Sequence, residues 1–256
     1  VDLQKKYGEF KVIQDVNLEI PVRKLTAIIG PNGAGKSTLL GLISRLIPKT
    51  SGEVYINDKV IEEWKDKELA KKLAILKQNN NVNLKITVEE LVAFGRFPYS
   101  NGRLTKEDKE IIARAINYMG LENIKKKYLN ELSGGQRQRA FIAMIIAQDT
   151  EYILLDEPLN SLDIKHAKEL MEIVRDLVDN YGKTIVIVLH DINFASTYAD
   201  NIIAMQEGKV VKIGSTSEII CNTVLDKLYE TNINILEHEK KKICIYYWKG
   251  GKWWKI

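Results

Sequence analysis

The sequence predicts an α/β fold in which helices cover both faces of a parallel sheet, and three features support this prediction. First, Leu25–Ile29, Tyr152–Leu155 and Thr184–Leu189 are continuous apolar runs, as expected for strands buried on both faces. Second, a helix is expected over residues 164–180, between the last two runs, and Asp163 is well placed to cap its N-terminus. Third, strand–helix–strand order is typical of parallel sheets, because parallel neighbours need a long crossover connection.

The first quarter of the chain is rich in predicted strands. Short alternating runs predict strands at Lys11–Val16 and Asn17–Ile20. Further strands are predicted at Glu53–Ile56 and Leu73–Leu76. One helix is expected to begin near Lys36.

From residue 87 the pattern becomes helical. Thr87–Glu90 and Thr105–Asp108 both have the spacing of a capping box, in which the first and fourth residues cap a helix start reciprocally. Apolar residues then recur at helical intervals until Gly120, which is expected to end that helix. A further helix is predicted over Arg137–Ala147.

These patterns divide the chain into three parts. We expect an α/β core in residues 1–86 and 146–220, an all-helical insert in residues 87–145, and a C-terminal tail in residues 221–256. The tail is predicted to hold a hairpin with strands at Ile233–Leu236 and Ile243–Trp248, joined by a charged turn. Residues 249–256 are basic and aromatic, which fits either contact with lipid headgroups or a solvated tail.

The composition, with 45% hydrophobic and 28% charged residues, is that of a globular protein. The net charge of +4 fits anionic nucleotides or a membrane surface, and it is too small to indicate nucleic acid. Cys221 and Cys244 lie in no metal-ligand pattern, which predicts two reduced cytosolic thiols. No signal peptide is visible, and Val1 in place of Met predicts that a few residues precede it. The longest apolar run, Phe141–Ala147, is far shorter than the roughly 20 residues of a membrane span, so a membrane location would depend on another chain.

A glycine-rich segment follows the run Leu25–Ile29 and opens a helix, which is the context of a phosphate-binding loop. Its glycines permit backbone angles at which successive N–H groups point inward, and the helix N-terminus adds partial positive charge. Lys36 is expected to reach the β- and γ-phosphates of ATP, and the Ser37 hydroxyl to ligate Mg²⁺. The residues predicted to bind ATP here are Gly30, Pro31, Asn32, Gly33, Ala34, Gly35, Lys36, Ser37 and Thr38.

Two acidic residues, Asp156 and Glu157, end the apolar strand that begins at Tyr152. Ligands of α/β sheets bind at the carboxyl ends of strands, so this pair is expected beside the phosphate loop. Asp156 is predicted to hold Mg²⁺ through water. Glu157 is predicted to polarise the water that attacks ATP.

A second anion site is predicted at Ser133, Gly134, Gly135 and Gln136, which precede the helix Arg137–Ala147. One nucleotide needs only one phosphate loop, so a second site in the same domain indicates a second nucleotide. A head-to-tail pair of chains with twofold symmetry satisfies this requirement. Each ATP would then lie between the phosphate loop of one chain and Ser133–Gln136 of the other.

In order and spacing, these motifs resemble those of the ABC ATPase family over nearly the whole chain: Gly30–Thr38 is similar to its Walker A, Leu132–Gln136 to its signature motif and Tyr152–Glu157 to its Walker B. The resemblance implies a P-loop NTPase fold, with a RecA-like core, an antiparallel β subdomain, an all-helical signature subdomain and a short C-terminal hairpin. It also implies ATP and Mg²⁺ as ligands.

The resemblance implies roles for residues outside these motifs. Gln78 is similar to the Q-loop glutamine, which contacts Mg²⁺ and joins the core to the helical insert. His190 is similar to the switch histidine, so Glu157, His190 and Gln78 form the expected catalytic set. Tyr7 matches the aromatic residue that stacks on adenine, and this role is favoured over the alternative that it packs in an N-terminal sheet. Ser161–Asp163 resembles the D-loop, which passes along the dimer seam.

Three classes of protein share this ATPase. A DNA-repair or chromosome ATPase would carry a long coiled-coil insert, whereas the insert here lacks sustained heptads. A translation factor usually carries two ATPase units in one chain. A transporter subunit is therefore the favoured class. We expect a homodimer that acts on a separate membrane permease at the cytoplasmic face of the membrane, and no binding of nucleic acid. ATP would close the dimer and hydrolysis would reopen it, giving the permease alternating access.

The insert also suggests a cargo. Leu91–Ser100 resembles the same stretch in ATPases of iron–siderophore, haem and cobalamin importers, and the ferric catecholate siderophore group is the most similar. Residues 73–78, 102–108 and 190–194 support this resemblance. The implied function is uptake of an iron–siderophore complex, delivered by an extracytoplasmic binding protein. Haem, cobalamin and zinc or manganese importers remain alternatives.

Overall fold

A six-stranded sheet forms the centre of the protein, with the strand order β10-β9-β3-β8-β7-β6. The computed structural model describes residues 1–78, 85–160, 162–239 and 241–246. Five strands of the sheet run parallel and β10 runs antiparallel at one edge. The strands span Leu25–Ile29 (β3), Leu73–Leu76 (β6), Tyr152–Asp156 (β7), Thr184–Val188 (β8), Asn201–Gln206 (β9) and Lys209–Ser215 (β10).

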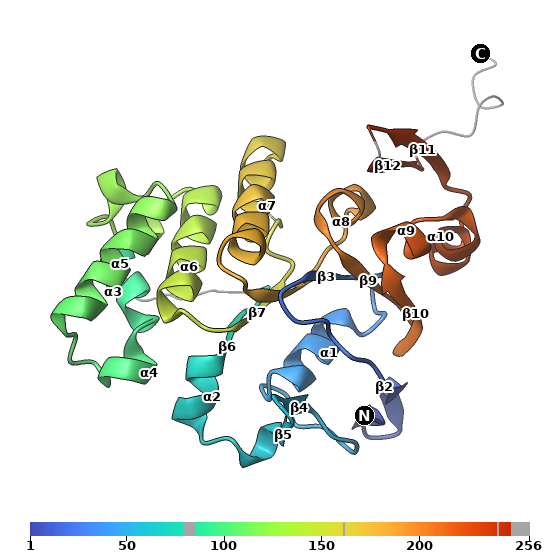
Figure 1. The fold of residues 1–256 in the computed structure, drawn as a ribbon, viewed down its shortest axis with the longest axis horizontal. Coiled ribbons are helices and arrows are strands. Elements are labelled where there is room, and N and C mark those ends of the chain that lie inside the picture. The colour runs from blue at the N-terminus through green and yellow to red at the C-terminus, as the bar shows by residue number, and fades with distance from the viewer. Residues whose placement is uncertain (79–84, 161, 240, 247–256) are drawn as a thin grey trace.

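Helices cover both faces of this sheet, and the alternation of side chains along the strands explains why (Figure 1). Leu25, Ala27 and Ile29 of β3 belong to the core that faces α7 (Ile164–Asp179) and α8 (Ile192–Tyr198), whereas Ile28 belongs to the core that faces α1 (Lys36–Ile43). Successive side chains of a strand point to opposite faces, so both faces of an apolar strand need a cover.

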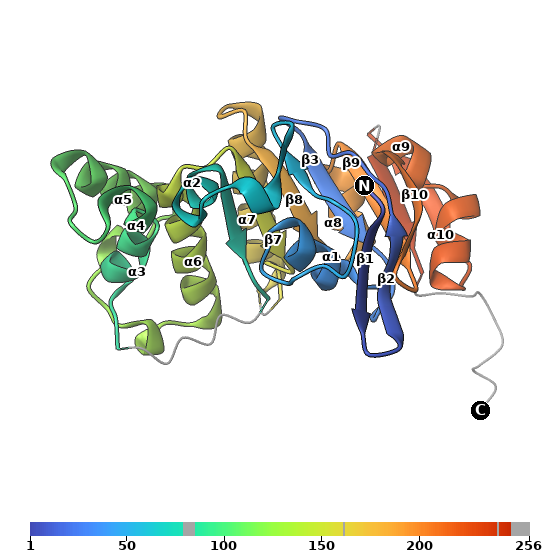
Figure 2. The same cartoon turned by 90° about the horizontal axis from the view of Figure 1, so that it is seen from below.

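The antiparallel β subdomain lies on the α1 side (Figure 2). Its paired strands are β1 (Leu3–Tyr7) with β2 (Phe10–Val16), and β4 (Tyr55–Ile56) with β5 (Lys59–Val60). A 3₁₀ turn at Ile61–Glu63 and helix α2 (Asp66–Lys72) lead from it into β6.

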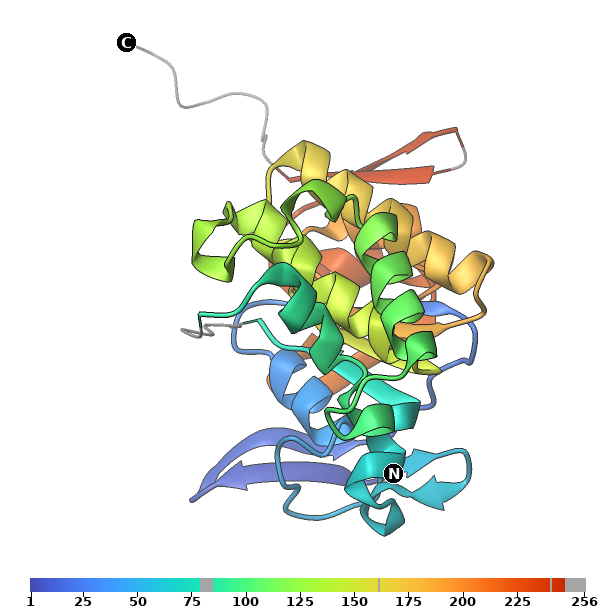
Figure 3. The same cartoon turned by 90° about the vertical axis from the view of Figure 1, so that its left-hand side faces the viewer.

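The helical insert forms a lobe at one end of the sheet (Figure 1), and this lobe faces the viewer in Figure 3. Its helices are α3 (Val88–Phe94), α4 (Phe97–Ser100), α5 (Lys106–Tyr118) and α6 (Gly134–Gln148), with 3₁₀ turns at Glu122–Ile124 and Leu129–Glu131. Both predicted capping boxes are present, at the starts of α3 and α5. Since α6 continues to Gln148, a division between residues 145 and 146 would pass through a helix.

The C-terminal part of the chain packs beside β9 and α8. It holds α9 (Thr216–Ile219), α10 (Asn222–Tyr229) and a hairpin of β11 (Asn234–His238) with β12 (Lys241–Ile245). The predicted hairpin is therefore confirmed, with slightly different ends. Residues 247–256, which include the basic aromatic segment, lie outside the described residues.

Two strand predictions in the first quarter are wrong in whole or part. Residues 17–20 form no strand, because the side chain of Asn17 exchanges hydrogen bonds with Asp2 at 2.7 and 2.8 Å while Leu18 and Ile20 turn toward the α1-side core. The strand predicted at Glu53–Ile56 shortens to β4, since the backbone N–H of Glu53 donates to the Val1 carbonyl instead.

Candidate functional site

The residues predicted to act on ATP lie at the carboxyl ends of four adjacent strands. The glycine-rich loop follows β3, His190 follows β8, Asp156 and Glu157 close β7, and Gln78 follows β6. Because these strands are neighbours in the order β3-β8-β7-β6, their ends meet along one edge of the sheet.

The loop between β3 and α1 has the backbone of an anion cradle. Gly30, Gly33 and Gly35 have φ values of 147°, 79° and 92°, a region that side chains disfavour. A Cβ atom at Gly30 would lie 2.0 Å from the carbonyl oxygen of Met205, and one at Gly35 would lie 2.8 Å from the Cδ1 of Ile13. The loop therefore needs glycine at both positions for space as well as for backbone angle.

Lys36 is folded into this loop. Its Nζ donates to the carbonyl oxygens of Gly30 at 2.8 Å and Pro31 at 2.9 Å, and the side chain is buried. Burial lowers the pKa of Lys36, while the carboxylates of Glu157 and Asp156 oppose that shift. The ammonium is thus held at the loop by polar partners that phosphate oxygens can replace.

Ser37 and Asp156 meet across the site, and this pair suits Mg²⁺. The Ser37 hydroxyl donates to Asp156 Oδ1 at 2.8 Å. Burial raises the pKa of Asp156, and the neighbouring Glu157 raises it further, whereas Ser37 and Lys36 act in the opposite direction. A hydroxyl and a carboxylate side by side are the oxygen donors that Mg²⁺ prefers, and a divalent cation here would relieve the crowding of the two carboxylates.

Glu157 is in polar contact with three side chains. His190 Nε2 lies 2.7 Å from Oε1, and Gln78 Nε2 and Asn160 Nδ2 both donate to Oε2, the latter at 2.6 Å. Glu157 is buried and has a φ of 50°, so its carboxylate is held in place by its surroundings. Asn160 was not predicted, because its contact with Glu157 depends on a turn that brings it back to that side chain.

Two predicted groups lie apart from this cluster. Ser133 caps α6, with Gln136 N–H donating to Ser133 Oγ at 3.3 Å and Ser133 N–H donating to Gln136 Oε1 at 3.2 Å. Tyr7 lies at the β1–β2 turn, where it is 55% exposed. Among the described residues, neither group shares a hydrogen bond with the phosphate loop, and Ser161 of the predicted D-loop lies outside them.

A hydrogen bond joins α6 to the segment that follows β7 and Glu157. Gln138 Nε2, in the second turn of α6, donates to the carbonyl oxygen of Pro158 at 3.0 Å. Gly135 also packs close to the Leu162 and His166 side chains. The start of α6 is therefore tied to the segment that follows Glu157. Ser133 and Gly134, at the tip of the helix, are exposed.

The comparison with known proteins decides the family. The sequence model of the ABC transporter family matches residues 13–160, which is more than half of the chain and spans the loop, Ser133–Gln136 and Glu157. The chain belongs to the ABC transporter family. The petrobactin import ATP-binding protein YclP of Bacillus subtilis (strain 168) is 54% identical over 246 residues, covering 96% of this chain and 98% of the relative. The ferric enterobactin transport ATP-binding protein FepC of Escherichia coli (strain K12) is 42% identical over 233 residues, covering 90% and 86%.

A solved structure confirms the fold prediction. The dimeric structure of MJ0796, a bacterial ABC transporter cassette, has a TM-score of 0.76 and 33% identity, and the match covers 84% of this chain and 97% of that one. This ABC protein is an ATPase that binds ATP with Mg²⁺, and members of the family work as dimers with membrane permease subunits. Within the part of the chain that the structure describes, no helix has both the length and the apolarity to cross a membrane.

Proposed function

We propose that this chain is the ATP-hydrolysing subunit of an importer for an iron–siderophore complex. The observation that carries the proposal is the 54% identity, over 96% of the chain, to a petrobactin import ATP-binding protein. The 42% identity to a ferric enterobactin transport protein supports the same class of cargo. We propose that the protein acts as a peripheral subunit at the cytoplasmic face of the membrane, on a separate permease served by an extracytoplasmic binding protein.

In this proposal Lys36 and the backbone of Gly30–Thr38 hold the phosphates of ATP. The backbone N–H groups of the loop and the N-terminus of α1 face the anion. Lys36 exchanges the carbonyl oxygens of Gly30 and Pro31 for phosphate oxygens, so its charge is already in place before ATP arrives. Tyr7 is proposed to stack on adenine, in keeping with its exposed position on the β1–β2 hairpin.

In this proposal Glu157 carries out hydrolysis together with the side chains that contact it. Ser37, Asp156 and the amide oxygen of Gln78 would hold Mg²⁺, which neutralises charge on the phosphates. The carboxylate of Glu157 takes up the proton of the attacking water, and His190 and Gln78 fix its orientation. A general base held by three polar contacts loses little freedom when the water binds.

A second copy of the chain completes each site. Ser133–Gln136 face outward at the start of α6, a 15-residue helix whose N-terminus carries partial positive charge. In a twofold pair, this terminus would meet the γ-phosphate bound to the partner subunit. The solved cassette of similar fold is a dimer, which supports the pairing of two chains.

The catalytic part of the proposal is tested with Glu157→Gln. The variant should bind ATP but lose about 10²–10⁴-fold in turnover, because the amide cannot accept the proton. ATP should then trap it as a dimer, which light scattering detects. The matched control is Glu151→Gln, at the exposed foot of β7. A Glu157→Gln rate within about threefold of wild type, with the permease present, would remove this residue from the role of base.

The cargo is tested by uptake in a strain from which the gene is deleted. Labelled iron is supplied as petrobactin, enterobactin and hydroxamate complexes, as haem and as free ions, with labelled cobalamin and zinc in parallel. Loss of uptake for one siderophore complex, restored by the wild-type gene and not by the Glu157→Gln gene, supports the proposal. Unchanged uptake from every siderophore, with loss of cobalamin or zinc uptake, contradicts the cargo and leaves the ATPase in place.

A further inference from the structure

Helix α8 begins immediately after the histidine that contacts Glu157. His190 is followed by Asp191, whose carboxylate accepts the N–H of Asn193 at 2.7 Å and caps the helix. A side chain that is joined to a helix by one capping residue moves with the first turn of that helix. The position of His190 therefore depends on what holds the start of α8.

The C-terminal hairpin holds that start. Asn193 Nδ2 donates to the carbonyl oxygen of Cys244 at 3.1 Å, and the Cys244 N–H donates to Asn193 Oδ1 at 2.7 Å. One turn further along α8, Ser196 Oγ donates to the carbonyl oxygen of Lys242 at 2.5 Å. One face of the helix thus pairs with the edge of β12 in place of a neighbouring strand.

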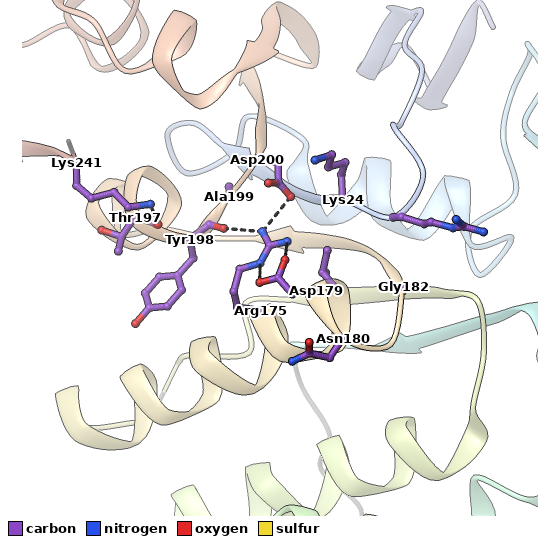
Figure 4. A pocket seen from close by; sticks show the side chains of 12 residues that line it. Lys24, Arg175, Asp179, Asn180, Gly182, Thr197, Tyr198, Ala199, Asp200 and Lys241 are labelled. Carbon is purple, nitrogen blue, oxygen red and sulfur yellow. Dashed lines mark hydrogen bonds and ion pairs between the residues drawn. The ribbon is translucent and has the colours of Figure 1, made fainter. Parts of the chain in front are cut away.

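The other end of α8 is anchored mainly by the core (Figure 4). Arg175 of α7 donates to the carbonyl oxygen of Tyr198 at 3.2 Å and to Asp200 at 2.9 Å. The hairpin adds one bond there, from Lys241 Nζ to the carbonyl oxygen of Thr197 at 2.8 Å. The core therefore fixes the end of α8 that is distant from ATP. At the end that carries His190, Leu189 and Ile192 pack in the core and the hairpin adds the two hydrogen bonds to Asn193.

The contact between Asn193 and β12 is partly buried. Cys244 is 2% exposed, and burial raises the pKa of its thiol to about 11. Hydrogen bonds in such a place are electrostatically stronger than at the surface, and a partner left unpaired there is costly. The pair is thus suited to hold the first turn of α8 in one position.

We propose that Asn193 is a positioning residue for ATP hydrolysis, through which the C-terminal hairpin sets the contact between His190 and Glu157. The inference rests on the proposed role of His190. Asn193 does not touch ATP. It fixes the first turn of α8, and through that turn it fixes the 2.7 Å contact between His190 Nε2 and Glu157 Oε1. Misplacing a catalytic group by about 1 Å can cost about 100-fold in rate.

The test compares three single variants of the full chain, assayed with the permease. Asn193→Ala removes both bonds to Cys244. Lys242→Met is the matched control, because it removes the side-chain bonds to the carbonyl oxygens of Ser217 and Ile220 and keeps the backbone carbonyl that accepts from Ser196 of α8. His190→Ala reports whether the histidine matters at all. For each variant we measure kcat, KM for ATP and the melting temperature, and we assay well below the lowest melting temperature.

The expected result is a kcat for Asn193→Ala at least about tenfold below wild type, with KM within about twofold, while Lys242→Met keeps its kcat within about twofold at a similar melting temperature. If Asn193→Ala does not fold, Asn193→Asp replaces it, since it keeps the acceptor for the Cys244 N–H and loses the donor. A kcat within twofold of wild type for the folded Asn193 variant, or equal losses in Asn193 and Lys242 variants, overturns the inference. Full activity in His190→Ala instead overturns the proposed role of His190.

Discussion

The buried ion pair of the helical lobe offers a sharp test of what holds that lobe together. Arg96 Nε lies 2.8 Å from Asp108 Oδ1, and the two side chains are 7% and 5% exposed. A second guanidinium nitrogen donates to the carbonyl oxygen of Ala147 at 3.0 Å, and the group lies 3.8 Å from the ring centre of Tyr99. Arg96 therefore joins α4, α5 and the C-terminal end of α6, and we predict that Arg96→Met destabilises the protein.

The structure sets the size of the effect. Removing one partner of a buried pair costs about 3–5 kcal/mol, because the other charge stays buried. We expect the low end, about 3 kcal/mol, since Asp108 Oδ2 keeps its two bonds from Thr105, at 3.0 Å from the N–H and 2.8 Å from the hydroxyl. The control is Lys168→Met, which breaks an exposed pair with Glu172 and should cost less than about 0.5 kcal/mol.

Urea denaturation measures the change in the free energy of unfolding for both variants. Equal m values for wild type and variant show that the unfolding reaction is unchanged. The pH dependence is a second readout. The Thr105 N–H and Arg96 hold the pKa of Asp108 below its usual value, so its contribution to stability is present above the unfolded pKa of about 3.9 and is lost as the pH falls through the folded pKa. The gap between wild type and Arg96→Met should therefore be full at pH 7 and shrink in acid. A gap below about 1 kcal/mol at pH 7, or one that does not change with pH, would refute this account.

Three shorter predictions concern the ATP site. Gly35→Ala should weaken ATP binding at least about tenfold, because its Cβ would lie 2.8 Å from Ile13 Cδ1 at a φ of 92°, and calorimetric titration with ATP checks this. Ser133→Arg should abolish ATP-dependent dimerisation and leave ATP binding by the isolated chain intact, as light scattering and titration would show; dimers at wild-type affinity would contradict the proposed seam. Asn160→Ala should lower kcat about threefold to tenfold with little change in KM, since Glu157 Oε2 loses its 2.6 Å donor, and an unchanged kcat would mean that the remaining donors suffice.

Features set by local sequence were predictable. The buried strand at Leu25–Ile29 was predicted with its observed bounds, and the capping boxes at Thr87 and Thr105 form as their spacing indicates. Asp163 caps α7 through the N–H of His166, as predicted. These features depend on the period of apolar residues and on contacts three residues apart, both of which a sequence contains.

Features set by distant partners were not predictable. The strand predicted at residues 17–20 fails because Asn17 bonds to Asp2, on the other side of a hairpin. The contact of Asn160 with Glu157 gives no pattern of apolar residues that could be read from the sequence. The same is true of the pairing of Asn193 with Cys244, which are 51 residues apart. Strands β9 and β10 and helices α8–α10 were also missed, although the capping box of Ser215 and Glu218 is a local signal for the start of α9.

Helix α6 has contacts of different kinds at its two ends. At its C-terminal end, Gln148 Nε2 donates to the carbonyl oxygens of Ala70 at 2.6 Å and Leu73 at 3.3 Å, which fixes it to the start of β6. Its other end carries Ser133. A helix of 15 residues is about 22 Å long, so a tilt of about 10° around Gln148 would swing Ser133 through about 4 Å. That distance is more than the length of a hydrogen bond, so a tilt of this size would make or break polar contacts at Ser133. Helix α6 is therefore anchored at one end on β6, the strand that precedes Gln78, and it carries Ser133 at its other end.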